Sequence, residues 1–480
     1  MELKKVIFIV FIIWVTGVHG ANIIGYFTNW GIYGDQPYTA SDVPYQKLTH
    51  IQYAFFKPEA NGEISSFDDY ADEQILLGEM IWSPTQHRDS TTSLIYLAHK
   101  NKVKVLASVG GWTGSSNFPS LAGSAISRSN FCSKARALIE RYSFDGIDID
   151  WEYPCYTEHN GTADDARNFV LLLAELRDTL DAMDGDKKLI TLAIAGGSFH
   201  GKDFLVEQFH PDVDFISVMT YDYTGEWGSY AWHNSPLYDY GLNDNWSLSR
   251  AMDYYLQRGV PSSKLNIGLA FYGKSFAGCE GPNQPFTGPG EISGSIDYST
   301  IDRKIQSGEY VRYWDDKAKV PYCLSSENEY CSFDDTVSIV LKSQYCLDKG
   351  FGGVIIWELK AGRLADGSQP LLNTVAEKLL SKVAVRKIEY TKSGRLEKLQ
   401  VVNSRTGHLK VRFNGGYRAD EISFKIYTLS GGFVFGTKGR CGGGCTEFQL
   451  PDVRLFLSGK YLLRINDGEE KYQTMFTIIK

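Results

Sequence analysis

The chain has 480 residues, 43% of them hydrophobic and 22% charged, with a formal net charge of −8. This length gives room for one large domain and one small domain. The net negative charge argues against nucleic acid or an anionic membrane as the main partner. No low-complexity tract interrupts the sequence, so the composition is that of a folded globular protein.

The first 20 residues carry the pattern of a secretory signal peptide. A basic start with Lys4 and Lys5 precedes the apolar run 6–15, and small residues follow up to Gly20. The apolar run is too short to span a bilayer comfortably, and no other segment is apolar enough to do so. We therefore expect cleavage near Gly20 and a secreted, extracellular protein without stable membrane insertion. We expect it to be a monomer.

Eight strand-like runs alternate with helical stretches. Most of the runs are nearly continuous apolar segments, as parallel strands covered on both faces require. The runs are 23–28, 48–56, 103–109, 146–151, 189–195, 215–221, 265–271 and 354–358. Amphipathic stretches such as 164–183 and 249–258 lie between them. Eight β-then-α units over this length predict a (β/α)8 TIM barrel within residues 21–383.

The most informative segment is residues 145–154, which read DGIDIDWEYP. Side chains alternate faces along a strand, so the last three acids share one face. Crowding and burial raise the pKa of at least one of them, and a carboxyl protonated near neutral pH can act as a general acid. A calcium loop fits less well, because it needs Gly at its sixth position and Glu at its twelfth. We expect no metal and no cofactor.

This segment resembles the signature of glycoside hydrolase family 18, the chitinases. Five further segments look like blocks of the same family and occur in the family's order. They are GYFTNWG at 25–31, KVLASVGGW at 104–112, MTYD at 219–222, GLAFYGKSF at 268–276 and GGVIIW at 352–357. The resemblance implies a secreted chitinase that cleaves β-1,4 N-acetylglucosamine linkages, with chitin and N-acetylglucosamine oligosaccharides as its partners.

The resemblance also implies catalytic roles for the acids. In the family's substrate-assisted retaining mechanism, the acetamido oxygen of the −1 sugar attacks the anomeric carbon, so no second carboxylate acts as nucleophile. Glu152 would be the general acid and base. Asp150 would orient the acetamide, and Asp148 would share a proton with Asp150. Tyr221 and Asp222 would contact the acetamide, where a Tyr hydroxyl stabilises developing charge.

Aromatic residues at strand ends would bind the sugar. In the family a Trp at the position of Trp357 floors the −1 subsite, and Trp112 and Trp227 resemble the +1 and +2 platforms. Smaller contacts would come from Tyr26, Met219 and Tyr272. Without this context, a lone Trp or Tyr is more often a packing residue.

Two other positions are notable. Asp145 begins the acidic segment and is expected to be structural, through hydrogen bonds to the barrel core. Lys274 stands where many relatives carry Arg, and the two side chains differ in their capacity for bidentate hydrogen bonding.

Two connections are long, 57–100 and 273–335. The second is rich in Gly, Pro, Tyr and Cys and resembles the small α+β insertion of deep-groove family members. Beyond it, alternation at period two, split by Gly and Asn, predicts a small β-sandwich over 384–480. This region weakly resembles the C-terminal sorting domains of one bacterial secretion route. An inert fibronectin-like spacer is the alternative. A sugar-binding module ranks below both, because no Trp stripe is visible.

Asn160-Gly-Thr162 and Asn245-Trp-Ser247 are N-glycosylation sequons. They matter only in a eukaryotic secretory path, so they oppose the bacterial sorting interpretation.

Eight cysteines in an exported chain favour disulfides, although spacing does not determine their connectivity. Cys132 and Cys155 are expected on the same rim of the barrel, so we favour that pair. The other pairs would be Cys323–Cys331, Cys441–Cys445 and Cys279–Cys346. Zinc is not indicated, because no CxxC pair or His-rich spacing is present.

Two other functions remain as alternatives. A non-hydrolytic chitin-binding lectin on the same barrel would usually lose the acid at position 152, whereas Glu152, Asp150 and Tyr221 are all present. An endoglycosidase that trims N-glycans would tend to lack the long insertion and the row of Trp platforms.

Overall fold

The computed structural model describes residues 21–380, apart from 84, 242–244 and 291–294, and the strands but not the loops of 384–479. The predicted signal peptide, Cys441 and Cys445 lie outside the described residues. Two compact units make up the chain, Met1–Leu379 and Leu380–Lys480. Within the described ranges, none of the helices combines the length and apolar character that a bilayer crossing requires.

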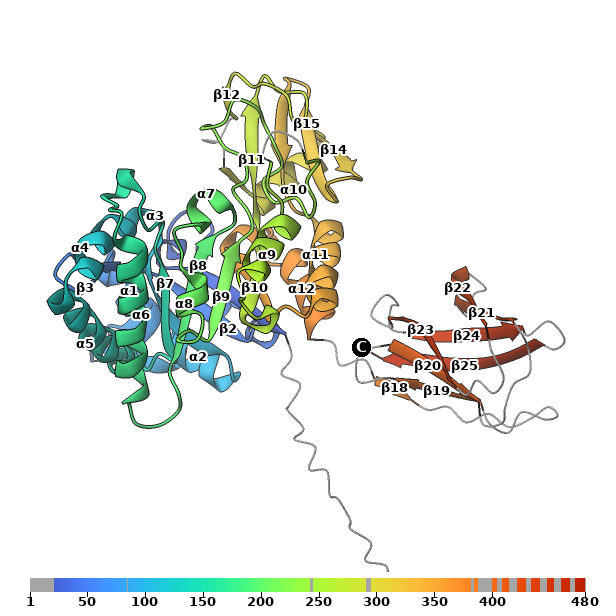
Figure 1. Cartoon of the computed structure of the whole chain (residues 1–480), viewed down its shortest axis with the longest axis horizontal. Coiled ribbons are helices and arrows are strands. Elements are labelled where there is room, and N and C mark those ends of the chain that lie inside the picture. Colours follow the sequence, from blue (N-terminus) through green and yellow to red (C-terminus); the bar gives the residue numbers. More distant parts are fainter. Residues whose placement is uncertain are drawn as a thin grey trace, which may run out of the picture. The chain divides into compact units, whose positions relative to one another are not determined.

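Eight parallel strands close into a barrel, which confirms the predicted fold (Figure 1). The strands follow the order β1, β17, β10, β9, β8, β7, β6, β2, and β1 also pairs with β2 to close the ring. Their bounds are β1 Asn22–Thr28, β2 His50–Pro58, β6 Lys104–Gly110, β7 Gly146–Asp150, β8 Leu189–Ala195, β9 Phe215–Met219, β10 Leu265–Ala270 and β17 Gly353–Trp357. Nearly every residue of these strands is buried, as the continuous apolar runs predicted.

Four of these strands end one or two residues earlier than predicted: β7 at Asp150, β9 at Met219, β10 at Ala270 and β17 at Trp357. Glu152, Tyr221 and Asp222 therefore lie on the loops that follow the strands. In a barrel of this kind, such loops build the site.

Helices cover the outside of the barrel. The two predicted amphipathic stretches form α6 and α9. The outward-facing Trp151 is fully buried between Phe118 and Phe169 of this helical layer, with ring centroids 5.1 and 5.3 Å away. The α-helices are α1 Asp69–Leu77, α2 Leu94–Lys100, α3 Gly111–Gly114, α4 Phe118–Gly123, α5 Ala125–Tyr142, α6 Asp165–Asp181, α7 Ser198–Gly201, α8 Val206–Phe209, α9 Leu248–Gln257, α10 Tyr298–Ser307, α11 Thr336–Lys349 and α12 Pro370–Leu379.

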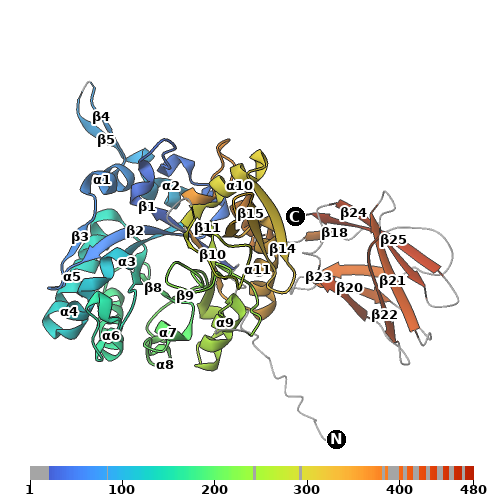
Figure 2. The same ribbon diagram turned by 90° about the horizontal axis from the view of Figure 1, so that it is seen from above.

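Short 3-10 turns complete the connections. They are η1 Asn29–Ile32, η2 Ala40–Asp42, η3 Tyr45–Lys47, η4 Ser90–Thr92, η5 Ser115–Asn117, η6 Thr157–His159, η7 Ser262–Lys264 and η8 Lys360–Gly362. In the long connection 57–100, β3 Ile64–Ser66 pairs with β2, and β4 Glu79–Ile81 with β5 His87–Asp89 forms a hairpin that projects from the barrel (Figure 2).

The predicted insertion forms an antiparallel sheet between β10 and α11, with α10 beside it (Figure 1). Its strands run in the order β12, β11, β16, β15, β14, and β13 pairs with β11. Their bounds are β11 Tyr272–Ala277, β12 Gly288–Pro289, β13 Ser295–Asp297, β14 Tyr310–Asp315, β15 Val320–Ser325 and β16 Glu329–Ser332.

From residue 384 on, the described residues of the second unit all lie in strands. They form one sheet in the order β18, β25, β24, β21, β22 and another in the order β19, β20, β23. The bounds are β18 Ala384–Arg386, β19 Leu399–Asn403, β20 His408–Phe413, β21 Glu421–Thr428, β22 Phe433–Arg440, β23 Glu447–Asp452, β24 Gly459–Asn466 and β25 Lys471–Ile479.

The six cysteines of the first unit are free thiols, so none of the predicted pairs Cys132–Cys155, Cys279–Cys346 and Cys323–Cys331 is formed. Cys132 lies within α5 instead of opening it, and its thiol contacts Thr179 of α6. The Cys279 thiol donates to the Gly281 carbonyl at 3.2 Å, and the Cys346 thiol to the Gly353 carbonyl at 3.3 Å. Each thiol is thus held by its own local surroundings.

Cys323 and Cys331 stand directly opposite each other on β15 and β16, and both are fully buried. Opposed residues of an antiparallel pair have Cα atoms about 4.5–5.5 Å apart. That separation lies within the range of about 4.4–6.8 Å that a disulfide spans.

We predict that refolding in a glutathione redox buffer oxidises Cys323 and Cys331 to a disulfide. Two thiols lose two electrons and two protons to oxidised glutathione. Mass spectrometry of a non-reduced digest should identify the linked peptides, and Cys323→Ser should leave Cys331 open to alkylation after unfolding. Alkylation of both cysteines in the refolded wild type would contradict the pairing.

Candidate active site

The loops at the carboxyl ends of the barrel strands bring most of the predicted site residues together. Tyr26, Met219, Tyr221 and Tyr272 belong to one buried cluster, and Trp357 packs against it. Asp148 and Asp150 lie on the neighbouring β7, and both are buried. Three carboxyl groups and several aromatic rings therefore lie together at the end of the barrel where active sites of this fold are found.

Asp148 is the most heavily hydrogen-bonded of the acids. Its carboxylate accepts from Gln52 Nε2 at 2.6 Å, Thr191 Oγ1 at 2.6 Å, Ser108 Oγ at 2.7 Å and Tyr26 Oη at 3.0 Å. Burial raises the pKa of Asp148, and the hydroxyl donors oppose that rise. Because donors favour the charged form, the ionised carboxylate is best accommodated here.

Asp150 has the opposite environment. It is 3% exposed, and its Oδ1 has no hydrogen-bond partner within the described part of the chain. Burial, followed by the charges of Glu152 and Asp148, raises the pKa of Asp150 well above its usual range. The protonated form is therefore favoured at Asp150. The predicted sharing of a proton between Asp148 and Asp150 stays a prediction.

Glu152 is fixed by its backbone at the start of the loop. Its N–H donates to Ser115 Oγ at 2.8 Å, and its carbonyl lies 2.5 Å from His159 Nδ1. Burial raises the pKa of Glu152 to about 7, the Tyr153 hydroxyl opposes this, and the charge of Asp222 raises the pKa further. A carboxyl with this pKa can both donate and accept a proton near neutral pH.

Tyr221 and Asp222 face the same cleft from the loop after β9. Burial, and then the nearby carboxylates, raise the pKa of Tyr221 well above its usual range, so its hydroxyl remains a proton donor. The Asp222 carboxylate forms an ion pair with Lys274 Nζ at 2.9 Å. Lys274 also donates to Ser295 Oγ at 2.9 Å and lies 5.6 Å from the ring centroid of Trp227.

Aromatic rings form the floor of the cleft. The Trp357 ring packs 5.1 Å from Tyr26 and 5.7 Å from Phe55 between centroids. Trp30, on η1, extends this floor, with its ring 6.2 Å from Phe55 and 6.4 Å from Trp357. Trp30 is 49% exposed, so one part of the floor is open to solvent.

Two Trp rings stand exposed at the rim, Trp112 at 52% and Trp227 at 70%. The Trp112 ring rests against His159, 4.5 Å away between centroids. Gly110 allows this turn, because its φ is +116° and a Cβ would lie 2.2 Å from the Asp150 carbonyl oxygen. Both rings have the exposure that stacking on a flat ligand needs.

Asp145 is the predicted site residue that lies away from the cleft. It precedes β7 at the opposite end of the barrel, where its carboxylate accepts from the Val105 N–H at 2.8 Å and pairs with His99 Nε2 at 2.9 Å. These contacts match the structural role expected from the sequence.

The sequence analysis did not single out Glu358, which follows Trp357 at the end of β17. Burial raises the pKa of Glu358 to about 7, against the opposing hydrogen bond from the Lys360 N–H, and the charge of Asp297 adds to the rise. Thr28 Oγ1 donates to Glu358 at 3.3 Å. The sequence signal that could have identified Glu358 is its position directly after the Trp that ends the eighth strand. Phe55 was missed too, because an aromatic residue inside an apolar run looks like core. Trp30 and Tyr153 lie within the segments GYFTNWG and DGIDIDWEYP, but the sequence analysis gave them no role.

Among the described residues, no group of three or more His, Cys, Asp or Glu side chains is arranged to hold a metal ion.

Comparison of this chain with known proteins identifies a matching family. Residues 22–362 match the family described as Glycosyl hydrolases family 18. Chitinase 1 of Aphanocladium album is 36% identical over 363 residues, which is 73% of this chain and 83% of that protein. The crystal structure of the Ostrinia furnacalis Group IV chitinase in complex with allosamidin has a TM-score of 0.67 at 29% identity and covers 75% of this chain and 99% of that one. Chitinase ChiA74 from Bacillus thuringiensis has a TM-score of 0.68 over 96% of this chain and 85% of its own, and at 24% identity it shows the likeness of fold alone.

We predict that Asp222→Asn lowers the pKa of Glu152 below about 7, because it removes a negative charge that disfavours the Glu152 carboxylate. The expected fall is about half a unit. Titration of the labelled Glu152 carboxyl by carbon-13 NMR measures it. The control is Asp316→Asn, which removes an exposed carboxylate on the insertion. An unchanged or higher Glu152 pKa in Asp222→Asn would show that Asp222 does not act on the acid.

Proposed function

Because the chain belongs to family 18 of the glycosyl hydrolases, we propose that it is a chitinase that hydrolyses β-1,4 linkages between N-acetylglucosamine units of chitin. The observation that carries the proposal is Glu152, a carboxyl with a pKa of about 7 in a cleft floored by Trp357. The named relative is called a chitinase, and the Ostrinia furnacalis enzyme was solved with allosamidin, which supports the same substrate class.

The reaction begins with proton transfer from Glu152 to the leaving glycosidic oxygen. As the bond from that oxygen to the anomeric carbon breaks, the acetamido oxygen of the same sugar forms a new bond to the anomeric carbon and gives an oxazolinium ion. Water then attacks the anomeric carbon, and the Glu152 carboxylate takes its proton. Two inversions at one carbon retain the β configuration.

Asp150 is placed to hold the acetamide. Its buried Oδ1 has no hydrogen-bond partner within the described part of the chain, although buried polar atoms almost always have one. The acetamide N–H of a bound sugar would supply that partner. The Tyr221 hydroxyl would donate to the acetamide oxygen, and the Asp148 carboxylate would balance the positive charge of the oxazolinium ion.

Trp112 and Trp227 would form the platforms for the sugars beyond the cleaved bond. Their rings are exposed, and neighbours hold both: His159 packs against Trp112, and Lys274 lies over Trp227. We further propose that residues 1–20 direct export of the chain and that the C-terminal unit acts in sorting or as a spacer.

The decisive experiment is product analysis on N-acetylglucosamine oligomers with detection of the anomer. Freshly released reducing ends should be β, and oligomers without acetyl groups should resist cleavage, because they lack the attacking oxygen. Newly formed α ends, or equally fast cleavage of deacetylated oligomers, would rule out the mechanism.

We predict that Glu152→Gln lowers turnover by about 10²–10⁴-fold or more, because Gln cannot donate the proton, while oligosaccharide binding survives. In the wild type, Glu152 holds its proton below about pH 7, so turnover should fall as the pH rises through that value. Glu140→Gln, an exposed change on α5, is the matched control. Full turnover by Glu152→Gln would refute the assignment of the acid.

We predict that Trp112→Ala slows degradation of the polymer several times more than cleavage of short soluble substrates. A long chain relies on stacking at sites beyond the cleaved bond, where each ring contributes about 1 kcal/mol. Rates on chitin and on a short chromogenic substrate measure the difference, with Trp82→Ala on the projecting hairpin region as the control. An equal loss on both substrates would show that Trp112 is not a platform.

A further inference from the structure

Asp222 has a backbone conformation that side chains seldom allow. Its φ is +56°, in the left-handed region. Asp tolerates this region better than most residues, but the conformation persists only where surrounding contacts hold it. The Asp222 side chain is partly open to solvent, with 45% of its surface exposed. The contacts that fix its backbone therefore have to come from a buried neighbour.

Asn234 is that neighbour, and it is 1% exposed. Its Oδ1 accepts from the Asp222 N–H at 3.1 Å, and its carbonyl accepts from the Tyr223 N–H at 3.2 Å. Its Nδ2 donates to the Tyr272 carbonyl at 3.3 Å, and its N–H donates to Ser332 Oγ at 2.9 Å. One buried residue thus joins the loop after β9 to β11 and β16 of the insertion.

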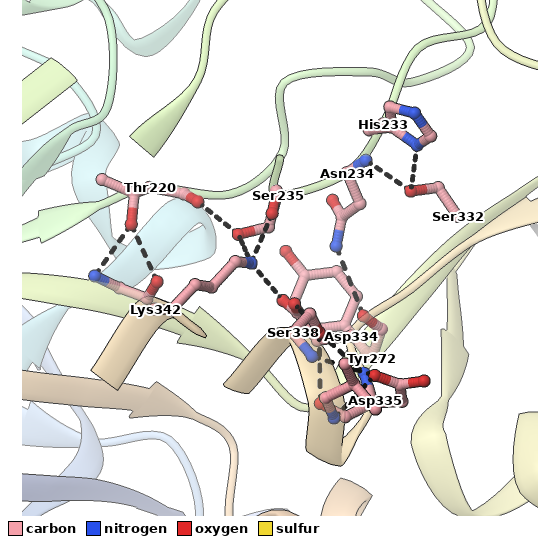
Figure 3. A network of polar contacts seen from close by, with 12 residues as sticks. Thr220, His233, Asn234, Ser235, Tyr272, Ser332, Asp334, Asp335, Ser338 and Lys342 are labelled. Carbon is pink, nitrogen blue, oxygen red and sulfur yellow. Dashed lines mark hydrogen bonds and ion pairs between the residues drawn. The ribbon is translucent and has the colours of Figure 1, made fainter. Parts of the chain in front are cut away.

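Both sequence neighbours of Asn234 are anchored as well (Figure 3). His233 Nε2 pairs with Asp315 Oδ2 of β14 at 2.9 Å. Lys342 of α11, fully buried, contacts Ser235 Oγ at 2.8 Å and the Asp334 carboxylate at 2.6 Å. Asn234 therefore lies within a rigid, desolvated network, in which each lost hydrogen bond leaves an unpaired polar group.

The position of Asp222 matters because its charge acts on Glu152. The other groups that interact with the Glu152 carboxyl are Asp150 on β7, the Tyr153 and Tyr221 hydroxyls and the Trp112 N–H. Tyr221 and Asp222 lie on the loop after β9, and Asn234 bonds that loop to the insertion. A shift of that loop would change the electrostatics of Glu152 without altering β7.

We propose that Asn234 is a positioning residue, which holds the Asp222 backbone in its left-handed conformation and so ties the geometry of the acid's surroundings to the insertion. The inference rests on the proposed function, because it concerns the reactivity of Glu152. Asn234 is buried, and we expect its effect on Glu152 to be transmitted through the Asp222 N–H, from which its Oδ1 accepts. The insertion thereby influences the pKa of Glu152 in the barrel.

Asn234→Leu tests the proposal, because Leu has a similar size and lacks both side-chain hydrogen bonds. Releasing Asp222 should lower the pKa of Glu152 by about half a unit and move the alkaline limb of turnover to lower pH by the same amount. Turnover above pH 7 should fall by up to about threefold, the effect of a half-unit fall in the pKa of the acid, with little change in KM, because Asn234 does not touch substrate. Carbon-13 NMR of the Glu152 carboxyl and pH profiles on N-acetylglucosamine oligomers measure both.

Ser338→Ala is the matched control. Ser338 is buried in the same network and bonds to Asp334 and Asp335, not to Asn234. It should lower the melting temperature and leave the Glu152 pKa and the pH profile unchanged. An Asn234→Leu protein with native near-ultraviolet circular dichroism and a wild-type Glu152 pKa would overturn the proposal.

Two further variants sharpen the result. Ser332→Ala removes the acceptor for the Asn234 N–H and the 3.4 Å contact with His233 Nδ1. It leaves both side-chain hydrogen bonds of Asn234 in place, so it should shift the Glu152 pKa in the same direction by a smaller amount. In an Asp222→Asn background, Asn234→Leu should produce no additional shift, because the charge is already absent. Additive shifts would contradict action through Asp222. The NMR readout does not need turnover, so an inactive wild type would refute the proposed function and leave this inference open to its own test.

Discussion

Three carboxyl groups in one buried cleft cannot all carry charge, and the rest of the site follows from how the barrel resolves this conflict. Asp148 receives four hydrogen-bond donors, whereas Oδ1 of Asp150 has no partner among the described residues. Glu152 lies one step further out, with a pKa of about 7. The barrel therefore stabilises negative charge at Asp148, and Glu152 holds the proton that can be exchanged. A general acid needs such a difference in pKa between neighbouring carboxyl groups.

The strand register of the barrel determines which donors reach Asp148. Ser108 of β6 and Thr191 of β8 are the register partners of Asp148 on either side of β7. Both hydroxyls therefore point into the same layer of the barrel interior as the carboxylate. Gln52 of β2 reaches that layer from a strand that does not pair with β7. A change of register by one residue would turn these donors to the other face and leave Asp148 without them.

The loops after the strands determine the outer half of the site. Glu152 depends on Ser115 and His159, and Asp222 depends on Lys274 from one side and Asn234 from the other. Lys274 and Ser332 both belong to the insertion. The hydrogen bonds of Asn234 and the Lys274–Asp222 ion pair therefore join the insertion to the loop that carries Asp222.

The sequence alone determined the eight strands, because parallel strands buried on both faces require unbroken apolar runs. It also located the acids and most of the aromatic residues, because one strand and the strand ends carry them in recognisable patterns. The predicted disulfides Cys132–Cys155 and Cys279–Cys346 failed, since spacing does not say which way a thiol points within a helix. Only the tertiary structure decided the donors of Asp148, with Gln52 96 residues away, and the role of Asn234, whose partner Ser332 is 98 residues away. Gln52 and Asp148 meet because both side chains point into the interior of the closed barrel, and Asn234 meets Ser332 because the loop after β9 packs against the insertion. Which of the three acids is protonated depends on these hydrogen bonds between distant residues, and no local sequence pattern predicts them.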